Sequence, residues 1–208
     1  ASLGETSGAC LFLKCELFQK TGSFKARGAL NNVLSLSAEE RAKGIVTISA
    51  GNHAQAVAWA AKRVMVPCVV VMPAGAPRSK VDAVRGYGAE IVFHDDLPTI
   101  FDRLEEVRRE RGAAFVHPFD DPLTLAGAGT TGLEIMQDLP GADVVIVPVG
   151  GGGLMAGVAT AVKEMSPRTC VVAVELEAGP GLKPALQAGK PVPVARPKDT
   201  LADGMTPP

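Results

Sequence analysis

Lys25 is the residue whose type and setting most directly suggest chemistry. It follows Ser23 and Phe24, lies just past a turn at residues 20–22, and opens a helical run. A primary amine held among small and aromatic neighbours is a candidate nucleophile that forms a Schiff base with a carbonyl group. Most lysines on helices are solvated surface charges, so the assignment depends on what else the chain carries.

Four consecutive glycines form a second candidate site, which we call the glycine loop: Gly150, Gly151, Gly152 and Gly153. The loop follows a β-branched run at 144–149 and precedes a helical pattern that begins at residue 154. Backbone N–H groups without neighbouring Cβ atoms can approach an anion closely, and a helix N-terminus adds partial positive charge. A tight strand-to-helix turn is the alternative, but it needs only one or two glycines. The loop therefore predicts a phosphate site.

A second strand-to-helix turn, which we call the serine turn, contains Ser49, Ala50, Gly51, Asn52 and His53. Its free N–H groups could hold a carboxylate, with the Ser49 hydroxyl as a further donor. The Asn52 amide could reach a ring oxygen of a bound cofactor. Alternatively, Ser49 or Asn52 merely caps the following helix.

These three sites must be positioned by strands and helices that alternate along the chain. Short β-branched runs between helical patterns predict βαβ units on parallel sheets, an α/β fold. We expect a small open domain at 44–121 and a larger cofactor-binding domain formed by 1–43 and 122–208, with the cofactor in the cleft between them. The predicted strands are 45–49, 67–72, 90–93, 114–116, 144–149 and 170–175, and the predicted helices are 53–63, 79–86, 98–111, 123–139, 154–165 and 181–188.

Composition excludes several classes of function. The 208 residues are 47% hydrophobic with a formal net charge of −1, and basic residues are interspersed with acids, as at 103–111, so we expect no nucleic-acid partner. The sequence contains no run of about 18 apolar residues, so we expect no membrane span. Four cysteines without metal-type spacing predict reduced thiols in a cytoplasmic protein. We expect His94 and His117 to be ordinary loop or surface residues.

On its motifs, the chain resembles the fold type II pyridoxal-phosphate enzymes, specifically the branch of serine/threonine dehydratases and serine racemases. Phe24 and Ala26, on either side of the lysine, favour this branch over the sulfhydrylases and cystathionine synthases. The matching motifs occur in family order across nearly the whole chain: Lys14-Cys15-Glu16, the segment 19–25, the serine turn, His117-Pro118, the glycine loop and Ala202-Asp203-Gly204.

The resemblance implies a role for each site. Lys25 would be the catalytic Schiff-base lysine, Phe24 would pack near pyridoxal 5'-phosphate, and Asn52 would contact the ring hydroxyl oxygen. The glycine loop would hold the phosphate, and the serine turn would hold the carboxylate of an amino-acid substrate. The implied reaction is β-elimination of L-threonine or L-serine to a 2-oxo acid and ammonia. Family members are usually homodimers or homotetramers, so we expect a homo-oligomer.

Two departures from the family pattern refine this expectation. The similar racemases carry a serine at the position of Ala50, where a hydroxyl can protonate the substrate face opposite the lysine, so Ala50 favours elimination over racemisation. Metal-stimulated members pair a glutamate with an aspartate six residues on, whereas Glu175 has Gly181 at that spacing. Glu175 could still bind a divalent metal, so a metal site stays open there but is not assigned. Relative to the family, we also expect the C-terminal third to be missing.

Other interpretations of the same residues stay open. A serine racemase or a hydroxyaspartate dehydratase of the same family would use the same lysine and loops. The pattern Gly151-x-Gly153-x-x-Ala156, with Glu175 ending the next strand, also fits a relaxed dinucleotide-binding fingerprint of a Rossmann protein. A non-catalytic chain that keeps the fold and serves as a binding partner is a third possibility.

Overall fold

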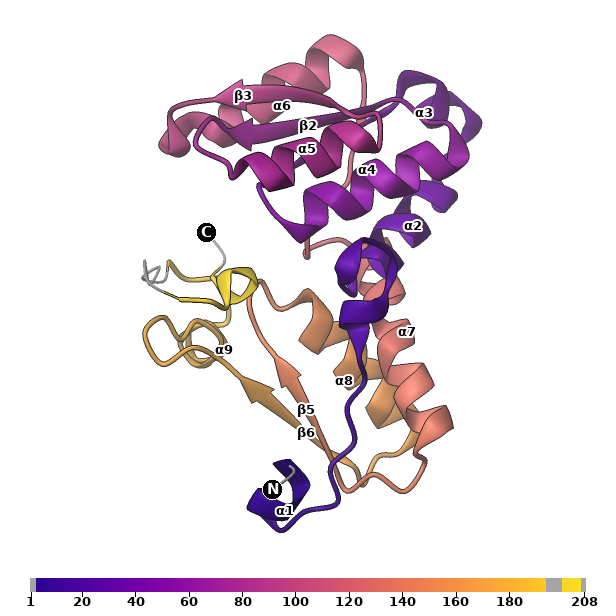
Figure 1. The fold of residues 1–208 in the computed structure, drawn as a ribbon, viewed down its shortest axis with the longest axis vertical. Coiled ribbons are helices and arrows are strands. Elements are labelled where there is room, and N and C mark those ends of the chain that lie inside the picture. Colours follow the sequence, from indigo (N-terminus) through magenta and orange to yellow (C-terminus); the bar gives the residue numbers. More distant parts are fainter. Residues whose placement is uncertain (1–2, 194–199, 207–208) are drawn as a thin grey trace.

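Two separate parallel sheets organise the chain, and they lie toward opposite ends of its long axis (Figure 1). The structure is a computed structural model that describes residues 3–193 and 200–206. Helix α2 (Lys25–Ser35) lies between the sheets, and α7 (Pro122–Asp138) runs from that region along the second sheet. The alternating α/β fold expected from the sequence is confirmed.

The first sheet has four strands in the order β3-β2-β1-β4, and every neighbouring pair is parallel. The two central strands, β1 and β2, are buried along nearly their whole length because helices cover both faces. On one face Val70 and Met72 pack with α4, and on the other Val69 and Val71 pack with α6. The elements of this four-stranded lobe are α3 (Ala38–Lys43), β1 (Ile45–Ile48), α4 (Asn52–Val64), β2 (Cys68–Pro73), α5 (Arg78–Gly86), β3 (Glu90–His94), α6 (Ile100–Arg111) and β4 (Ala114–Phe115).

The second sheet pairs β5 (Val144–Pro148) in parallel with β6 (Cys170–Val174). Alternate residues face α7 and α8 (Gly153–Met165), where Val145 and Val147 are buried with Val158 and Val162. The opposite face of this two-stranded lobe is open: Ile146 is 61% exposed. A period of two in burial is what a sheet covered on a single face requires.

Close helix packing joins α2 to α7 and α7 to α8. A Cβ added at Gly127 of α7 would lie 2.6 Å from the Arg27 carbonyl oxygen of α2, and one at Gly157 of α8 would lie 2.5 Å from the Leu125 carbonyl oxygen of α7. These contacts are between backbones, so neither helix could retreat without losing its packing. Glycine at these positions sets the distance between the helices.

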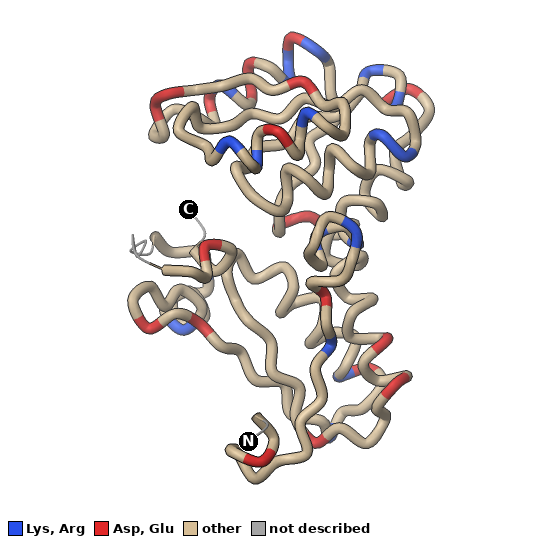
Figure 2. The backbone as a smooth tube through the Cα atoms, in the orientation of Figure 1, with Lys and Arg blue, Asp and Glu red and all other residues tan. Residues whose placement is uncertain are grey.

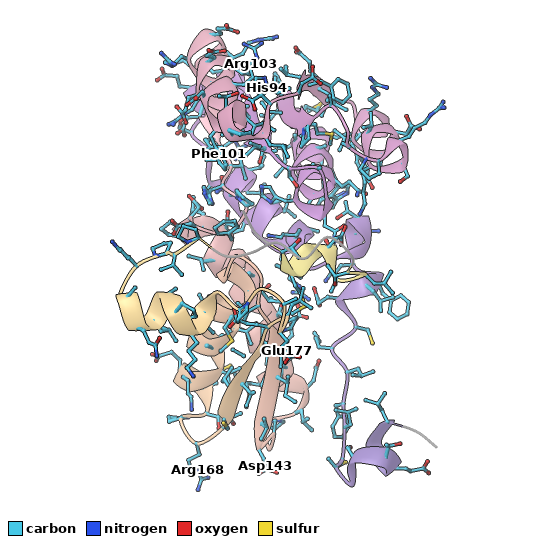
Figure 3. All side chains as sticks on the ribbon, turned by 90° about the vertical axis from the view of Figure 1, so that its left-hand side faces the viewer. His94, Phe101, Arg103, Asp143, Arg168 and Glu177 are labelled. Atoms are coloured by element: carbon cyan, nitrogen blue, oxygen red, sulfur yellow. The ribbon has the colours of Figure 1, made fainter. Side chains whose placement is uncertain are left out.

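Strand direction places the glycine loop near the middle of the molecule. Asp143 and Arg168, which precede β5 and β6, lie at the far end of the two-stranded lobe, whereas His94, Phe101 and Arg103 lie in the four-stranded lobe (Figure 3). The carboxyl ends of β5 and β6 therefore point toward the four-stranded lobe. Ligands of open parallel sheets bind beyond these ends.

The element limits differ from the predicted ones by at most two residues, whereas the domain boundaries stay a prediction. A missed helix, α3, had a readable signal: Ser37 and Glu40 form a capping box at its start. The remaining short elements are α1 (Leu3–Ser7), η1 (Glu16–Phe18), η2 (Lys20–Gly22), η3 (Leu97–Thr99), α9 (Leu182–Ala188) and η4 (Asp203–Met205).

Charged residues of both signs are interspersed along the four-stranded lobe (Figure 2). The described part of the chain has no helix with the length and apolar character needed to span a bilayer. The ends of the predicted larger domain, residues 1–2 and 207–208, lie outside the described residues, as does the segment 194–199.

Candidate active site

Lys25 is the first residue of α2, and its amine is held in a poorly hydrated place. Nζ donates a hydrogen bond of 2.6 Å to the Pro118 carbonyl oxygen and lies 5.2 Å from the centre of the Phe24 ring. Burial lowers the pKa of Lys25 to about 8 because the charged form is poorly solvated there. Near pH 8 about half of the molecules would therefore carry a neutral, nucleophilic amine.

One small cavity brings the lysine and the end of the glycine loop together. Its walls come from α2, from residues 118 and 119, and from the starts of α7 and α8. The enclosed volume is about 10 Å³, room for a single water molecule, so any larger group bound to the amine must extend beyond it. The lining residues are Phe24, Lys25, Gly28, Pro118, Phe119, Thr124, Ala128, Gly153 and Leu154.

At Gly150, Gly151 and Gly153 the glycine loop is packed so closely that a side chain has no room. A Cβ at Gly151 would collide with the ring of Phe119, and one at Gly153 would lie 2.9 Å from the Phe119 carbonyl oxygen. Gly152 has a φ of +86°, a left-handed conformation that L side chains rarely adopt. The loop leads directly into α8, whose first amide N–H groups have no partner within the helix and favour an anion.

The motif 202–204 lies against the start of this loop. A Cβ at Gly150 would lie 2.7 Å from the Gly204 carbonyl oxygen and 3.2 Å from Cα of Met205. The motifs at 150–153 and 202–204 are thus brought together in space although some fifty residues separate them in sequence.

The serine turn leads from β1 into α4 as predicted. The Ser49 hydroxyl oxygen accepts a 3.0 Å hydrogen bond from the Gly51 N–H, which leaves its own O–H free to donate. The Asn52 amide oxygen lies 3.5 Å from Nζ of Lys80 on α5. No side chain caps α4, so neither Ser49 nor Asn52 has the capping role that was the alternative.

The side chain of His53 does not belong to the surface of the serine turn. It is 3% exposed, and its Nε2 lies 3.1 Å from the Val116 carbonyl oxygen. Burial, with a smaller contribution from the Lys25 charge, lowers the pKa of His53 to about 3, so the imidazole is neutral at ordinary pH and Nε2–H donates to that carbonyl. His53 could serve a carboxylate only through its backbone N–H.

His117 organises the segment that faces the lysine. Its Nδ1 accepts hydrogen bonds from the N–H groups of Phe119 and Asp120, at 3.2 and 2.8 Å. Its ring makes edge contacts with the rings of Phe115 and Phe119. His117 was expected to be an ordinary loop residue; the structure places it where it fixes the turn that presents the Pro118 carbonyl to Lys25.

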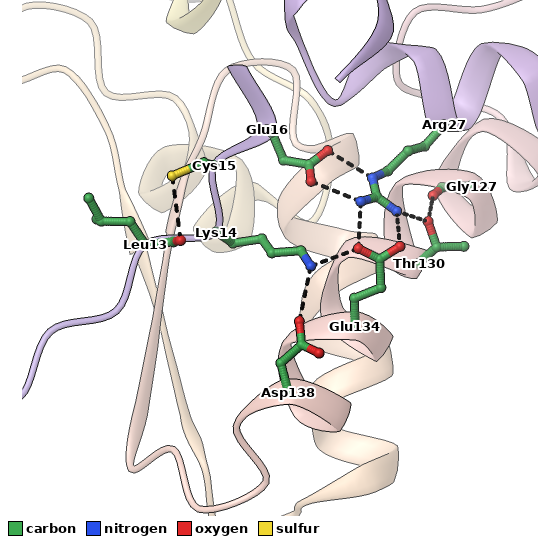
Figure 4. A network of polar contacts seen from close by, with 9 residues as sticks. All are labelled: Leu13, Lys14, Cys15, Glu16, Arg27, Gly127, Thr130, Glu134 and Asp138. Atoms are coloured by element: carbon green, nitrogen blue, oxygen red, sulfur yellow. Dashed lines mark hydrogen bonds and ion pairs between the residues drawn. The ribbon is translucent and has the colours of Figure 1, made fainter. Parts of the chain in front are cut away.

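A network of ion pairs joins α2 to α7 and to the segment around η1 (Figure 4). Arg27 contacts Glu16 and Glu134, and Lys14 contacts Glu134 and Asp138. The sequence analysis did not find this network, because its members lie up to 124 residues apart and no local pattern pairs them.

One carboxylate oxygen of Glu175 is engaged by backbone N–H groups. Its Oε1 accepts hydrogen bonds from the N–H groups of Gly181 and Leu182, at 2.8 and 2.6 Å. This use of the carboxylate competes with both a metal and a ribose hydroxyl. Within residues 3–193 and 200–206, no three His, Cys, Asp or Glu side chains are grouped closely enough to hold a metal ion.

The structure thus brings Phe24, Lys25 and Gly153 to one cavity, with Gly151 packed on its Phe119 wall. Asn52 and the rest of the serine turn do not line that cavity. Sequence reasoning missed Phe119, Thr124 and Ala128 as wall residues. Only Phe119 had a signal, because it directly follows the His117-Pro118 motif.

The residues present fit pyridoxal phosphate. The cofactor needs an amine for its aldehyde, and burial keeps the Lys25 amine partly neutral. It also needs an anion site, and the glycine loop leads into the N-terminus of α8, where backbone N–H groups have no partner within the helix. The two groups border the same cavity.

Comparison with protein families supports this fit. The model of the family described as "Pyridoxal-phosphate dependent enzyme" matches residues 1–208. The L-threonine ammonia-lyase of Thermotoga maritima is 48% identical over 207 residues, which cover 98% of this chain and 51% of that protein. A serine racemase of Oryza sativa is 42% identical over 205 residues, which cover 98% of this chain and 60% of that protein.

Among solved structures, that of maize serine racemase is similar, with a TM-score of 0.92 and 40% sequence identity. The match covers 97% of this chain and 61% of the maize chain. The chain therefore spans about half to three fifths of the lengths of the proteins with which it is compared.

Proposed function

The chain belongs to the family of pyridoxal-phosphate-dependent enzymes, and on that premise we propose that it takes part in β-elimination of water from L-threonine or L-serine. The products would be a 2-oxo acid and ammonia. The observation that carries the proposal is that the buried Lys25 amine and the end of the glycine loop line the same cavity.

When bound, pyridoxal phosphate joins the lysine amine and withdraws electrons from Cα of an amino acid. Lys25 is proposed as the base that removes the Cα proton, since burial lowers its pKa to about 8 and leaves a neutral amine available near pH 8. The Pro118 carbonyl, 2.6 Å from Nζ, orients the amine.

The two strand-to-helix turns are proposed to hold the charged ends of the ligands. The glycine loop, at the N-terminus of α8, would bind the cofactor phosphate through backbone N–H groups. The serine turn, at the N-terminus of α4, would bind the substrate carboxylate, with the free Ser49 O–H as an additional donor. We keep Asn52 as the partner of the ring oxygen and Phe24 as the side chain beside the cofactor.

Elimination is favoured over racemisation by a single side chain, Ala50. Reprotonation of Cα from the face opposite Lys25 needs a proton donor, and a methyl group is none. Racemisation is the second candidate, because serine racemases from rice and maize are among the similar proteins. Hydroxyaspartate is a further candidate substrate, because the serine turn and Lys25 would serve it equally well.

The proposal is tested by incubating the chain and pyridoxal phosphate with L-threonine or L-serine. We expect 2-oxobutanoate from threonine, or pyruvate from serine, and no D-serine by chiral chromatography; Lys25→Ala is the control. Formation of D-serine faster than pyruvate would overturn the choice of elimination. Cofactor bound at Lys25 without turnover of L-threonine, L-serine or 3-hydroxyaspartate would favour the non-catalytic alternative.

We also propose a cytoplasmic homo-oligomer, a dimer or a tetramer. The four cysteines are unpaired, as expected of a reducing compartment, and Ile146 on the open face of the two-stranded lobe is 61% exposed. Light scattering coupled to size-exclusion chromatography measures the oligomeric state, and a monomer at micromolar concentration would contradict that part of the proposal.

A further inference from the structure

Arg27 is held by an unusually complete set of hydrogen bonds (Figure 4). Its Nε and Nη2 donate to the two carboxylate oxygens of Glu16, both at 2.8 Å. Its Nη1 and Nη2 donate to the two oxygens of Glu134 at 2.6 and 2.7 Å, and Nη1 also donates to Thr130 at 3.0 Å. The guanidinium thus forms two bidentate pairs at once, the geometry in which arginine binds carboxylates most strongly.

The ion pairs of Arg27 are largely shielded from solvent. The Arg27 side chain is 10% exposed, and that of Glu16 is 17% exposed. The hydrogen bond and charge of Arg27 lower the pKa of Glu134 to about 2, with Lys14 adding a smaller contribution. One guanidinium therefore joins three elements: the segment around η1, the first turn of α2, and α7.

Helix geometry makes this contact relevant to Lys25. Successive residues of an α-helix are rotated by about 100°, so residues two apart point to opposite sides. Arg27 faces the segment around η1 and α7, whereas Lys25 faces the cavity. An anchor on one side of the first turn therefore sets the direction of the side chain on the other.

The other hydrogen bonds between α2 and α7 lie further along. Asn31 donates to the Leu123 carbonyl oxygen at 2.7 Å, and Asn32 donates to Asp121 at 2.8 Å. These contacts begin more than a turn beyond Lys25. Within the first turn, Arg27 supplies the side-chain hydrogen bonds to α7, beside the close backbone packing at Gly127.

We propose that Arg27 is a positioning residue for Lys25: clamped between Glu16 and Glu134, it fixes the first turn of α2 so that the lysine amine stays against the Pro118 carbonyl. Its importance for catalysis rests on the proposed function, but the placement of the amine is a property of the cofactor-free chain. The groups that face Lys25 are His53 and His117, and burial lowers the pKa of both, which favours their neutral forms.

Arg27→Lys is the informative variant, because it keeps one positive charge between the two carboxylates but loses the forked guanidinium that makes both bidentate pairs. Arg27→Met would leave Glu16 without its ion-pair partner and Glu134 with Lys14 alone, which risks unfolding the chain. Glu16→Gln removes the charge of one of the two carboxylates that hold Arg27, with almost no change of shape. Lys14→Gln is the matched control, because it breaks the peripheral ion pairs with Glu134 and Asp138 but leaves the fork intact.

The experiment is competitive acetylation of the cofactor-free 208-residue chain between pH 6 and 11, with mass mapping of the Lys25 peptide and a parallel thermal unfolding curve. A loosened first turn lets water reach the amine and raises the pKa of Lys25 from about 8 toward 10.5. A rise of one unit lowers the neutral fraction at pH 8 roughly five-fold.

We therefore expect the pH profile of Lys25 acetylation in Arg27→Lys to shift upward by about one pH unit or more relative to its own plateau, and Lys14→Gln to leave the profile unchanged. If Arg27→Lys does not fold, Glu16→Gln carries the same expectation with a smaller shift. An acetylation profile of Lys25 identical to that of the native chain, with only the unfolding temperature lowered, would show that Arg27 is merely structural and overturn the proposal. This outcome is independent of turnover, so it is distinguishable from failure of the proposed function.

Discussion

Replacing Lys25 by methionine tests the electrostatics of the site without any cofactor. Methionine keeps most of the length of the side chain and removes the charge. The folded chain holds this amine in a place that lowers its pKa from 10.5 to about 8, so the charged form is disfavoured on folding. The native chain should therefore be least stable relative to Lys25→Met at low pH.

The sign and size follow from linkage. Between pH 8 and 10.5 the unfolded chain binds more protons at Lys25 than the folded chain does, so the free energy of unfolding rises with pH. From pH 7 to pH 9.5 the contribution of Lys25 rises by about 2 kcal/mol, out of a limit of about 3.4 kcal/mol for the whole shift. Lys25→Met should lack this rise.

Urea unfolding of the cofactor-free chain, with and without Lys25→Met, measures the difference at pH 7, 8, 9 and 9.5. The control is Lys43→Met, because Lys43 is on the surface and its partner Glu39 raises rather than lowers its pKa. If the difference in unfolding free energy between the native chain and Lys25→Met is constant over this range, Lys25 is solvated and the proposed chemistry of its amine loses its physical basis.

Three further predictions concern packing, capping and thiol chemistry. Gly157→Ala should lower the free energy of unfolding, measured in urea, by about 1–3 kcal/mol, because its Cβ would lie 2.5 Å from a carbonyl oxygen of α7. The control Gly141→Ala, whose Cβ would have nothing within 4 Å, should cost far less. Equal costs would contradict the close helix packing. Asp121→Ala should cost about 2 kcal/mol, since its carboxylate accepts both the N-cap hydrogen bond of α7 and the Asn32 amide at 2.8 Å, and an unchanged urea midpoint would contradict this. Burial raises the pKa of Cys68 to about 12, so at pH 8 a disulfide reagent should label the exposed Cys10 at least tenfold faster; equal rates would contradict its burial.

Local signals in the sequence were sufficient for most of the fold. β-Branched runs such as 144–149, followed by glycine and a helical pattern, placed β5, the glycine loop and α8 within one residue of their observed limits. Glycine at 150–153 indicated a close approach, and the structure shows what approaches: Phe119 and the residues around Gly204. The glycine pattern indicates that another part of the chain comes close to the loop, but it does not identify which part.

Features of the site that depend on long-range contacts could not be read from the sequence. Arg27 and Glu134 are 107 residues apart, and the carbonyl that receives the Lys25 amine lies 93 residues from it. The side chain of His53, placed at a turn by sequence, is drawn into the core because α4 packs directly on the four-stranded sheet. Such contacts are set by the packing of whole elements, on which a local pattern carries no information.

The central claim, that Lys25 is the lysine to which the cofactor is joined, is tested most directly by borohydride reduction after incubation of the chain with pyridoxal phosphate, followed by peptide mass mapping. We predict a single pyridoxyl adduct on Lys25 at one equivalent of cofactor, absent from Lys25→Met. An adduct spread over surface lysines, with Lys25 unmodified, would contradict the assignment of the site.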